Sequence, residues 1–173
     1  MTDVIIRQAM PDDDLADLPA MQIAAGALFR ELGMDLVADG PTPVLPEFEA
    51  ARTSGHLIVA VSCEGGLVGF VRTCPLDGAL HVEQVTVAPD WGHQGIGRRL
   101  VRAAEQCALH QGFTRMTLTT YRDVPFNGPF YEQLDWKALD DEDLTHGLVT
   151  ERRGEAAAGL DQWPRIAMGI SLL

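Results

Sequence analysis

The chain has 173 residues, of which 46% are hydrophobic, and this is enough to build one domain over residues 1–173 with a sizeable core. Its formal net charge of −12 excludes nucleic acid as a partner, because binding phosphates needs a basic surface. The same charge mildly favours cationic small molecules as ligands, but a role in solubility alone explains it equally well. No apolar run reaches the ~18–20 residues of a membrane span, and no basic segment with a long apolar one opens the chain. We therefore expect no membrane partner and a cytoplasmic location.

The first third of the chain predicts one strand and several helical segments. Residues 3–10 are predicted to form the strand. In residues 11–34, acids gather at the start, where a helix dipole favours them, and Pro19 either divides the region or marks a helix start. A short helix is expected from Pro46. The apolar side chains that recur at helical spacing are Leu15, Leu18, Met21, Ala25, Leu28 and Leu32.

The middle of the chain predicts neighbouring strands. Residues 56–63 and 67–75 read as a hairpin joined by Glu-Gly-Gly, and residues 79–89 follow as a longer strand after an Asp-Gly turn. The alternation breaks near Glu83–Gln84, which is the pattern of a β-bulge.

A helix is expected after this strand, from residue 96 to a cap at Gly112, followed by a strand over 113–121. Residues 124–136 predict a turn into a short helix. The order of these elements is mixed α/β and not a repeated βαβ array, so a doubly wound fold is not expected.

The last quarter of the chain is less informative. Residues 138–147 form an acidic loop in this interpretation, and residues 148–164 contain too much Gly and Ala to predict an element. Residues 165–173 alternate like a final strand.

The three cysteines, Cys63, Cys74 and Cys107, support neither disulfides nor a metal site. They are odd in number, and none forms the CxxC spacing of a zinc ligand pair. Each lies in an apolar run, where a cysteine usually acts as a small buried hydrophobe.

A glycine-rich loop joins the strand over 79–89 to the following helix. The first N–H groups of a helix have no partner within it, and the helix dipole adds positive charge there, so such a junction suits an anion. Gly95 and Gly97 leave the backbone accessible, and Arg98 and Arg99 add charge. The third glycine of a dinucleotide fingerprint and the lysine of a P-loop are both missing. A turn that binds nothing stays an alternative.

The loop resembles motif A of the GNAT acetyltransferase superfamily. Val87-Ala88-Pro89 matches the strand end of that motif, and Gly92–Gly97 matches the loop. Gly92 stands where the family usually has Gln or Arg, a contact that Gln94 or the arginines could replace. The hairpin over 56–75 also resembles the family. In the downstream segment Pro129–Trp136, Tyr131 matches the family tyrosine and Asp135-Trp136 replaces Gly-Phe.

The resemblance implies an α/β fold with a mixed, mostly antiparallel central sheet of about seven strands. Helices flank this sheet, and a splayed, V-shaped slot in it holds the cofactor. It also implies acetyl-CoA as cosubstrate and no metal. The pyrophosphate would lie on the loop and the pantetheine arm would pair with the preceding strand. The implied cofactor-binding residues are Val85, Thr86, Val87, His93, Gln94, Gly95, Ile96, Gly97, Arg98, Arg99 and Asn127. Asn127 lies closer to Tyr131 than the family asparagine usually does.

The same resemblance implies two catalytic side chains. Tyr131 would protonate the leaving thiolate, since a phenol with a pKa near ~10 is protonated at neutral pH. Glu83, an acid within an otherwise apolar strand, is the candidate base, directly or through water. His81 lies on the same strand face and is a second candidate, and ordered water alone is a third. Candidate acceptor-site residues are Phe29, Glu31, Trp91, Thr119, Tyr121, Asp123 and Trp163.

The expected function is therefore transfer of an acetyl group from acetyl-CoA to the primary amine of a small molecule or peptide by direct attack on the thioester. The alternative is a non-catalytic acyl-CoA sensor or partner-binding module on the same fold, which the departures at Gly92 and Asp135 slightly favour. Family members often form homodimers. The sequence leaves the acceptor open.

Overall fold

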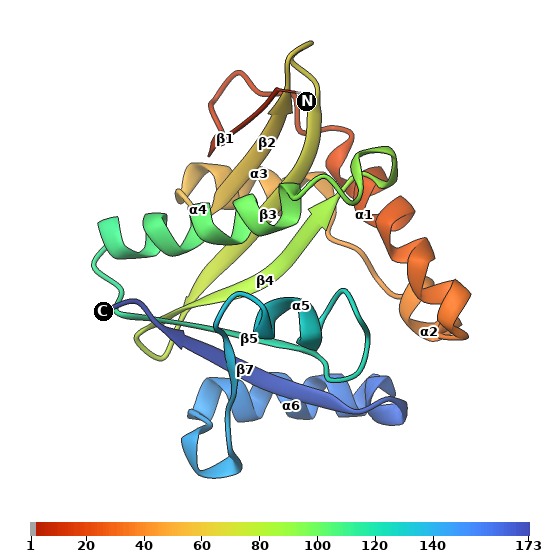
Figure 1. Cartoon of the computed structure of the whole chain (residues 1–173), viewed down its shortest axis with the longest axis vertical. Helices are drawn as coiled ribbons and strands as arrows, with labels where there is room; N and C mark the ends of the chain where they lie inside the picture. The colour runs from red at the N-terminus through yellow and green to blue at the C-terminus, as the bar shows by residue number, and fades with distance from the viewer. Residues whose placement is uncertain (1–2) are drawn as a thin grey trace. The chain divides into compact units, whose positions relative to one another are not determined.

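The strands of the chain form one mixed sheet. The computed structural model describes residues 3–173. Within them, seven strands are hydrogen-bonded in the order β1-β2-β3-β4-β5-β7-β6. Strands β4 and β5 are parallel, and the other registered pairs are antiparallel. The predicted mixed, mostly antiparallel sheet of seven strands flanked by helices is confirmed (Figure 1). The strands are β1 Val4–Gln8, β2 Leu57–Ser62, β3 Leu67–Leu76, β4 Ala79–Val87, β5 Arg115–Tyr121, β6 Lys137–Ala138 and β7 Arg165–Ser171.

The described chain forms two compact units, and β3, β4 and the long helix α4 each contribute residues to both. The first unit contains the residues up to Thr73 together with Glu83–Gln106. The second unit contains Cys74–Val82 and Cys107–Leu173. The single domain expected over residues 1–173 stays a prediction.

The first unit packs helices on β2 and β3. Phe48 of α3 and Phe70 of β3 are fully buried, with ring centroids 5.1 Å apart in an edge-to-face arrangement. Leu18 and Val59 belong to the same core cluster. The helical elements are α1 Leu18–Gly26, η1 Ala27–Leu32, α2 Asp35–Ala38, α3 Leu45–Thr53, η2 Pro89–Trp91 and α4 Ile96–His110, the last of which ends in the second unit.

The region before α1 differs from its predicted structure. Pro19 lies at the start of α1, as one alternative had it, but no acid occupies the first turn of the helix. Asp13 instead accepts two hydrogen bonds from Arg7 and one from the Met10 backbone, each 2.7 Å long. The predicted apolar face also ends early, because a 3₁₀ segment follows Gly26 and changes the helical phase. Leu28 is consequently exposed.

The second unit is built around β5 and β7. These strands pair at seven positions, from Arg115 opposite Ser171 to Tyr121 opposite Arg165. The helix α6, which the sequence analysis did not predict, lies alongside β5 in this unit (Figure 1). The remaining elements here are α5 Gly128–Glu132, η3 Asp141–Asp143, α6 His146–Ala157 and η4 Leu160–Gln162.

The three cysteines form no disulfide within residues 3–173, and they are less buried than expected. Cys63 is exposed, and Cys74 and Cys107 are half-buried. The reason for Cys63 is its position at the end of β2, where the chain turns into the hairpin. Within residues 3–173, no group of His, Cys, Asp and Glu side chains is arranged to hold a metal ion. Over the same residues, no helix combines the length and the apolar surface that crossing a bilayer requires.

Candidate active site

The end of strand β4 packs unusually closely against Gly69 of the neighbouring strand β3. A Cβ atom on Gly69 of β3 would lie 2.9 Å from the backbone oxygen of Thr86 and 3.2 Å from the Leu100 side chain. Only glycine therefore lets β3, the end of β4 and helix α4 pack this tightly. Thr86 itself is buried, whereas Val85 and Val87 are half-buried. This packing positions the strand end from which the glycine loop begins.

The loop leads directly into α4. Gly95 has φ +76°, a left-handed conformation that favours glycine, and His93 has φ +59°. Ile96 is 2% exposed and anchors the first turn of α4, whereas His93, Gln94 and Gly95 are exposed. These exposed residues thus lie at the end of a 15-residue helix where the first N–H groups have no partner within the helix. The residues present fit the phosphate group of a coenzyme.

The two arginines after the loop differ in their contacts, and Gly92, the atypical residue of the loop, has an ordinary backbone conformation. Arg98 is exposed, but the Arg99 guanidinium donates a 2.6 Å hydrogen bond to the Val4 carbonyl of β1. At least one of its N–H groups is therefore used within the fold. Gly92 has φ −62° and ψ 159°, which any residue adopts, but a Cβ there would lie 3.2 Å from the Pro89 carbonyl oxygen. The backbone angles do not require glycine at this position.

A pocket of about 360 Å³ opens in the first unit beside β4. It includes Glu83, the candidate base. The residues that line it come from α1, the loop before α3, α3 itself, β3 and β4. They are Gln22, Pro41, Thr42, Pro43, Glu47, Arg72, Glu83 and Gln84. Among these lining residues, only Glu83 is a site residue predicted from the sequence.

Arg72 lies between two carboxylates in this pocket. Its Nε lies 3.5 Å from Glu83 Oε2, and its Nη1 lies 3.9 Å from Glu47 Oε1. The guanidinium also stands over the Phe48 ring, with 5.9 Å between its central carbon and the ring centroid. The Glu83 side chain is 33% exposed, whereas that of Arg72 is 15% exposed. Glu83 therefore faces the pocket.

Tyr131 lies on α5 of the second unit. It is 8% exposed, and its ring contacts those of Phe130 and Trp136 at centroid distances of 5.1 and 5.8 Å. Burial raises the pKa of the Tyr131 phenol well above its usual value. The hydroxyl is thus protonated at neutral pH, as a proton donor must be.

The backbone around Tyr131 explains the unusual local sequence. A Cβ atom on Gly128 would lie 2.5 Å from the Arg122 carbonyl oxygen, so the chain needs glycine just before this short helix. Asp135 adopts φ +70°, the left-handed conformation suited to the glycine it replaces, and the following Trp136 is 1% exposed. The Asn127 side chain donates to the Phe126 carbonyl at 2.9 Å.

His81 occupies a buried position in the second unit. It is 5% exposed, and its Nδ1 lies 2.9 Å from the Thr117 hydroxyl on β5. Burial lowers the pKa of this imidazole, an effect that the charge of Glu155 partly opposes. A neutral histidine in a hydrogen bond to the neighbouring strand fits a structural role.

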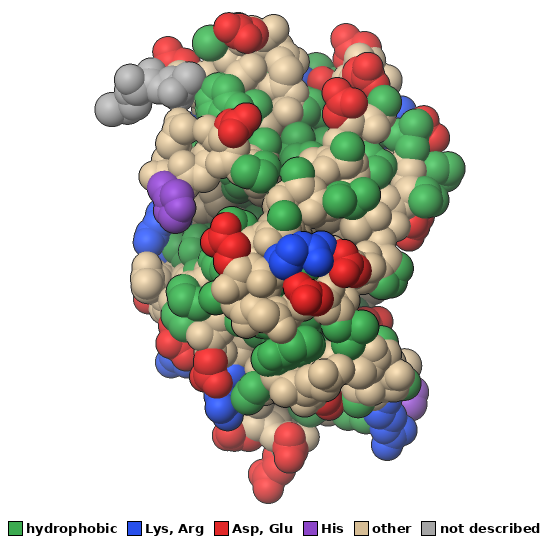
Figure 2. Space-filling model, turned by 90° about the vertical axis from the view of Figure 1, so that its right-hand side faces the viewer, with side chains coloured by type: hydrophobic (Ala, Val, Ile, Leu, Met, Phe, Trp, Pro, Cys, Tyr) green, Lys and Arg blue, Asp and Glu red, His purple; other side chains and the backbone are tan. Residues whose placement is uncertain are grey.

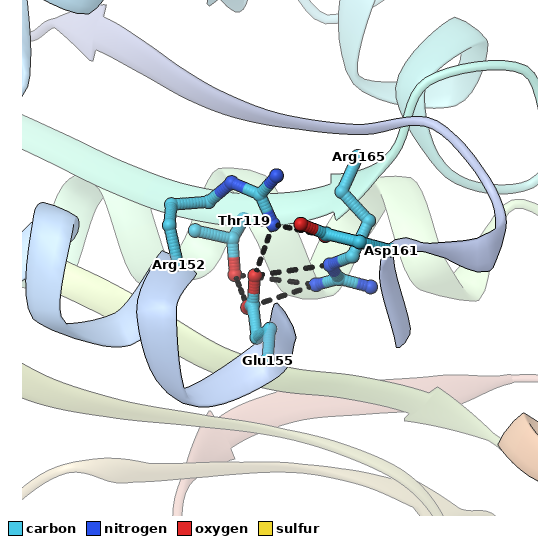
Figure 3. Close-up of polar contacts among 5 residues, drawn as sticks. All are labelled: Thr119, Arg152, Glu155, Asp161 and Arg165. Atoms are coloured by element: carbon cyan, nitrogen blue, oxygen red, sulfur yellow. Dashed lines mark hydrogen bonds and ion pairs between the residues drawn. The ribbon is translucent and has the colours of Figure 1, made fainter. Parts of the chain in front are cut away.

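A polar network connects α6 with β5 and β7 (Figure 3). The Glu155 carboxylate accepts hydrogen bonds from Thr119, from Arg152 at 2.7 Å and from Arg165 at 3.0 Å. Burial by itself would raise the pKa of Glu155, but the hydrogen bonds from Arg165 and Thr119 outweigh it and lower the pKa. Asp161 completes the network through Arg152 at 3.2 Å.

Three of the candidate acceptor residues belong to the second unit's framework. Thr119 donates to Glu155, and Tyr121 packs under the Arg165 guanidinium, 4.3 Å from its ring centroid. Trp163 contacts Tyr121 edge-to-face at 6.4 Å. These contacts hold the unit together, and none of the seven candidates lines the pocket beside Glu83.

The negative charge of the chain is dispersed on the face that Figure 2 shows. Acidic side chains lie there in several separate places among hydrophobic and neutral groups. Around Glu83, in contrast, charged groups lie close together, because two carboxylates and one guanidinium line the same pocket.

A comparison of the sequence with models of protein families identifies the class of protein to which this fold belongs. The sequence model of the acetyltransferase (GNAT) family matches residues 25–136, more than half of the chain. The chain therefore belongs to the GNAT family of acetyltransferases.

Solved structures share the fold. N-acetylglutamate synthase from Neisseria gonorrhoeae, in complex with coenzyme A and N-acetyl-glutamate, matches with a TM-score of 0.69 and 16% identity over 100% of this chain, which spans 36% of that protein. PaiA N-acetyltransferase from Thermoplasma acidophilum, in complex with coenzyme A, matches with a TM-score of 0.67 and 15% identity over 98% of this chain and 99% of its own. The ribosomal-protein-S18-alanine N-acetyltransferase of Escherichia coli matches with a TM-score of 0.66 and 13% identity, covering 98% of this chain and 94% of its own. Coenzyme A is thus the ligand in two of these neighbours.

Proposed function

We propose that the chain is an acetyl-CoA-dependent N-acetyltransferase that acts on the primary amine of a small molecule or peptide. The observation that carries this proposal is the junction of the loop and α4. There, Gly95 takes a left-handed conformation and His93, Gln94 and Gly95 are exposed in front of the helix. Acetyl-CoA supplies an acetyl group already activated as a thioester.

The coenzyme would be held by the backbone. The amides of His93, Gln94, Gly95, Ile96, Gly97 and Arg98 would bind the pyrophosphate, with Arg99 at the rim, and Val85, Thr86 and Val87 would pair with the pantetheine arm. Support for the first part is the exposure of the loop and the buried anchor Ile96, which fixes where the helix begins. Asn127, whose amide donates to Phe126, is the least supported member of this set.

The chemical step would be a direct transfer. The amine nitrogen forms a bond to the thioester carbonyl carbon as the bond between that carbon and sulfur breaks. Glu83, directly or through water, takes the proton that the amine loses, and Tyr131 gives a proton to the thiolate that leaves. Support comes from the exposure of Glu83 in a pocket and from the protonated state of the buried Tyr131.

A thiol-release assay tests this function. The chain is mixed with acetyl-CoA and a panel of amines, and free coenzyme A thiol is measured together with the acetylated product. Stoichiometric formation of both supports the enzyme. Coenzyme binding without thiol release on any amine supports the alternative of an acyl-CoA sensor instead. The cytoplasmic location, the homodimer and the splayed slot stay predictions.

A further inference from the structure

We propose that the pocket beside β4 takes a protonated amine that carries no carboxylate, with its ammonium bound by the carboxylates of Glu83 and Glu47 on the open side of the pocket, away from Arg72. This inference rests on the proposed acetyltransferase function, and it names the acceptor class of that site.

The charges that face the pocket are mainly negative. Glu47 and Glu83 have side chains that are 51% and 33% exposed, whereas the side chain of Arg72 is 15% exposed. Two carboxylates and one guanidinium leave a net charge of −1 among the lining residues. A ligand that enters therefore meets carboxylate oxygens before it meets the guanidinium.

The carboxylate oxygens still have room for hydrogen bonds. Arg72 lies 3.5 Å from Glu83 and 3.9 Å from Glu47, which exceeds the 2.7–3.2 Å typical of an N–H···O hydrogen bond. The Glu83 carboxylate accepts no hydrogen bond from any residue of the described chain, 3–173. Glu47 uses Oε2 to accept the Val44 N–H at 2.8 Å, which caps α3, and keeps Oε1 on the side of Arg72.

A third acceptor lies in the pocket wall. The side-chain oxygen of Gln22 is buried and has no hydrogen-bond partner within residues 3–173. The last torsion of a glutamine is soft, so rotation of the amide would turn this oxygen toward the pocket. An ammonium has three N–H donors and no acceptor, which matches the acceptors of Glu47, Glu83 and Gln22.

The pocket offers little to a carboxylate. Pro41 and Pro43 form part of the wall and have no backbone N–H to donate. The one cationic side chain of the lining is Arg72, and a carboxylate bound to it would lie beside two like charges. An amino acid therefore fits this pocket less well than the amine left after its carboxylate is removed.

Matched substrate pairs test the inference on the full chain. We would compare tyramine with tyrosine, phenethylamine with phenylalanine, and cadaverine with lysine, at saturating acetyl-CoA. The expected result is a kcat/KM at least about 10-fold higher for the decarboxylated member of each pair. Equal or higher values for the amino acids would overturn the proposal.

A variant locates the effect in the pocket. Glu47→Gln keeps an oxygen that can accept the Val44 N–H, so α3 stays capped, but it removes one of the two negative charges. The KM for tyramine should rise about 5-fold or more with little change in kcat, because Glu47 is not the proposed base. Glu49→Gln, on the same helix but outside the lining, should leave both constants unchanged. An unchanged KM in Glu47→Gln contradicts the proposed position of the ammonium.

Binding measurements separate this inference from the proposed function. Calorimetry of tyramine and tyrosine with the coenzyme A-loaded chain reports acceptor binding without turnover. If tyramine binds more tightly and no amine releases thiol, the acetyltransferase function fails and the pocket assignment stands. If neither amine binds, or tyrosine binds more tightly, the pocket assignment fails whatever the turnover assay gives.

Discussion

Gly69 of β3 lies beside Thr86 of the neighbouring strand β4, so closely that a Cβ atom on Gly69 would stand 2.9 Å from the Thr86 backbone oxygen. Gly69→Ala should therefore force β3 and β4 apart and lower the free energy of unfolding by about 1–3 kcal/mol. Urea unfolding measures this change. If the strand end also holds the coenzyme, the same variant should bind coenzyme A more weakly.

A glycine in an open position provides the control. Gly154 of α6 has no atom within 4 Å of a Cβ added to it, so Gly154→Ala should raise the stability by about 0.5–1 kcal/mol through the better helix propensity of alanine. Equal loss of stability in both variants would mean that the contact with Thr86 is not the cause.

Replacing Tyr131 by phenylalanine tests the proton donor. The ring contacts with Phe130 and Trp136 remain, but the hydroxyl is lost. A general acid typically contributes about 10²–10⁴-fold, so kcat should fall about 100-fold or more, while the Kd for coenzyme A changes little. Steady-state kinetics and calorimetry measure the two quantities. An unchanged kcat would remove Tyr131 from the reaction.

The loop assignment predicts a loss of coenzyme affinity when Gly95 is replaced. Its φ of +76° is strained for any residue with a β-branched side chain, so Gly95→Val should disturb the loop at a cost of about 1–2 kcal/mol. That cost corresponds to about a 5- to 30-fold higher Kd for coenzyme A, measured by calorimetry.

Gly65 is a matched control for Gly95. It has φ +86° in the β2–β3 turn, and, as at Gly95, a Cβ atom there would meet no neighbour within 4 Å. Gly65→Val carries a similar strain away from the loop, so it should lower stability without changing coenzyme affinity. A similar rise of Kd in both variants would show that the effect is global.

Removing the charge of Glu155 should destabilise the chain at neutral pH. The side chains of Arg165 and Glu155 are 9% and 14% exposed, so Glu155→Gln leaves the largely buried Arg165 without its counter-charge. A loss of about 3 kcal/mol is expected from urea unfolding at pH 7. Asp161→Asn, at a carboxylate that is 46% exposed, should cost less than about 1 kcal/mol.

The advantage of the wild type over Glu155→Gln should depend on pH. Because the folded pKa of Glu155 is lowered, its stabilisation is fully present above the unfolded pKa of about 4.3. It is lost as the pH falls through the lower folded pKa. The difference in unfolding free energy between the two proteins should therefore be constant from pH 7 to about 5 and shrink below about 4. A difference that persists undiminished at pH 3 would contradict the charge as its origin.

Local patterns were sufficient for most elements of this protein. Apolar runs on either side of a Glu-Gly-Gly turn predicted β2 and β3, an alternating run predicted β7, and an apolar face predicted α4. Asp135 was a departure from the family pattern in the sequence, but in the structure it takes the same left-handed conformation as a glycine. Its backbone role could not be read from its side chain.

Helix α6 shows where local patterns fail. Its sequence is rich in Gly and Ala and has no clear apolar stripe. Glu155 connects this helix to Thr119 of β5, which lies far away in the sequence, and to Arg165 of β7. Long-range contacts of this kind outweigh weak local propensity.

The sequence by itself determined the family, the glycine loop in front of α4 and the candidate roles of Tyr131 and Glu83, because these depend on residues close together in the chain. Only the tertiary structure decided which side chains surround Glu83. Gln22, Glu47 and Arg72 come from three separate elements, and no spacing in the sequence relates them. Their charges act across space, and the fold sets the distances over which they act.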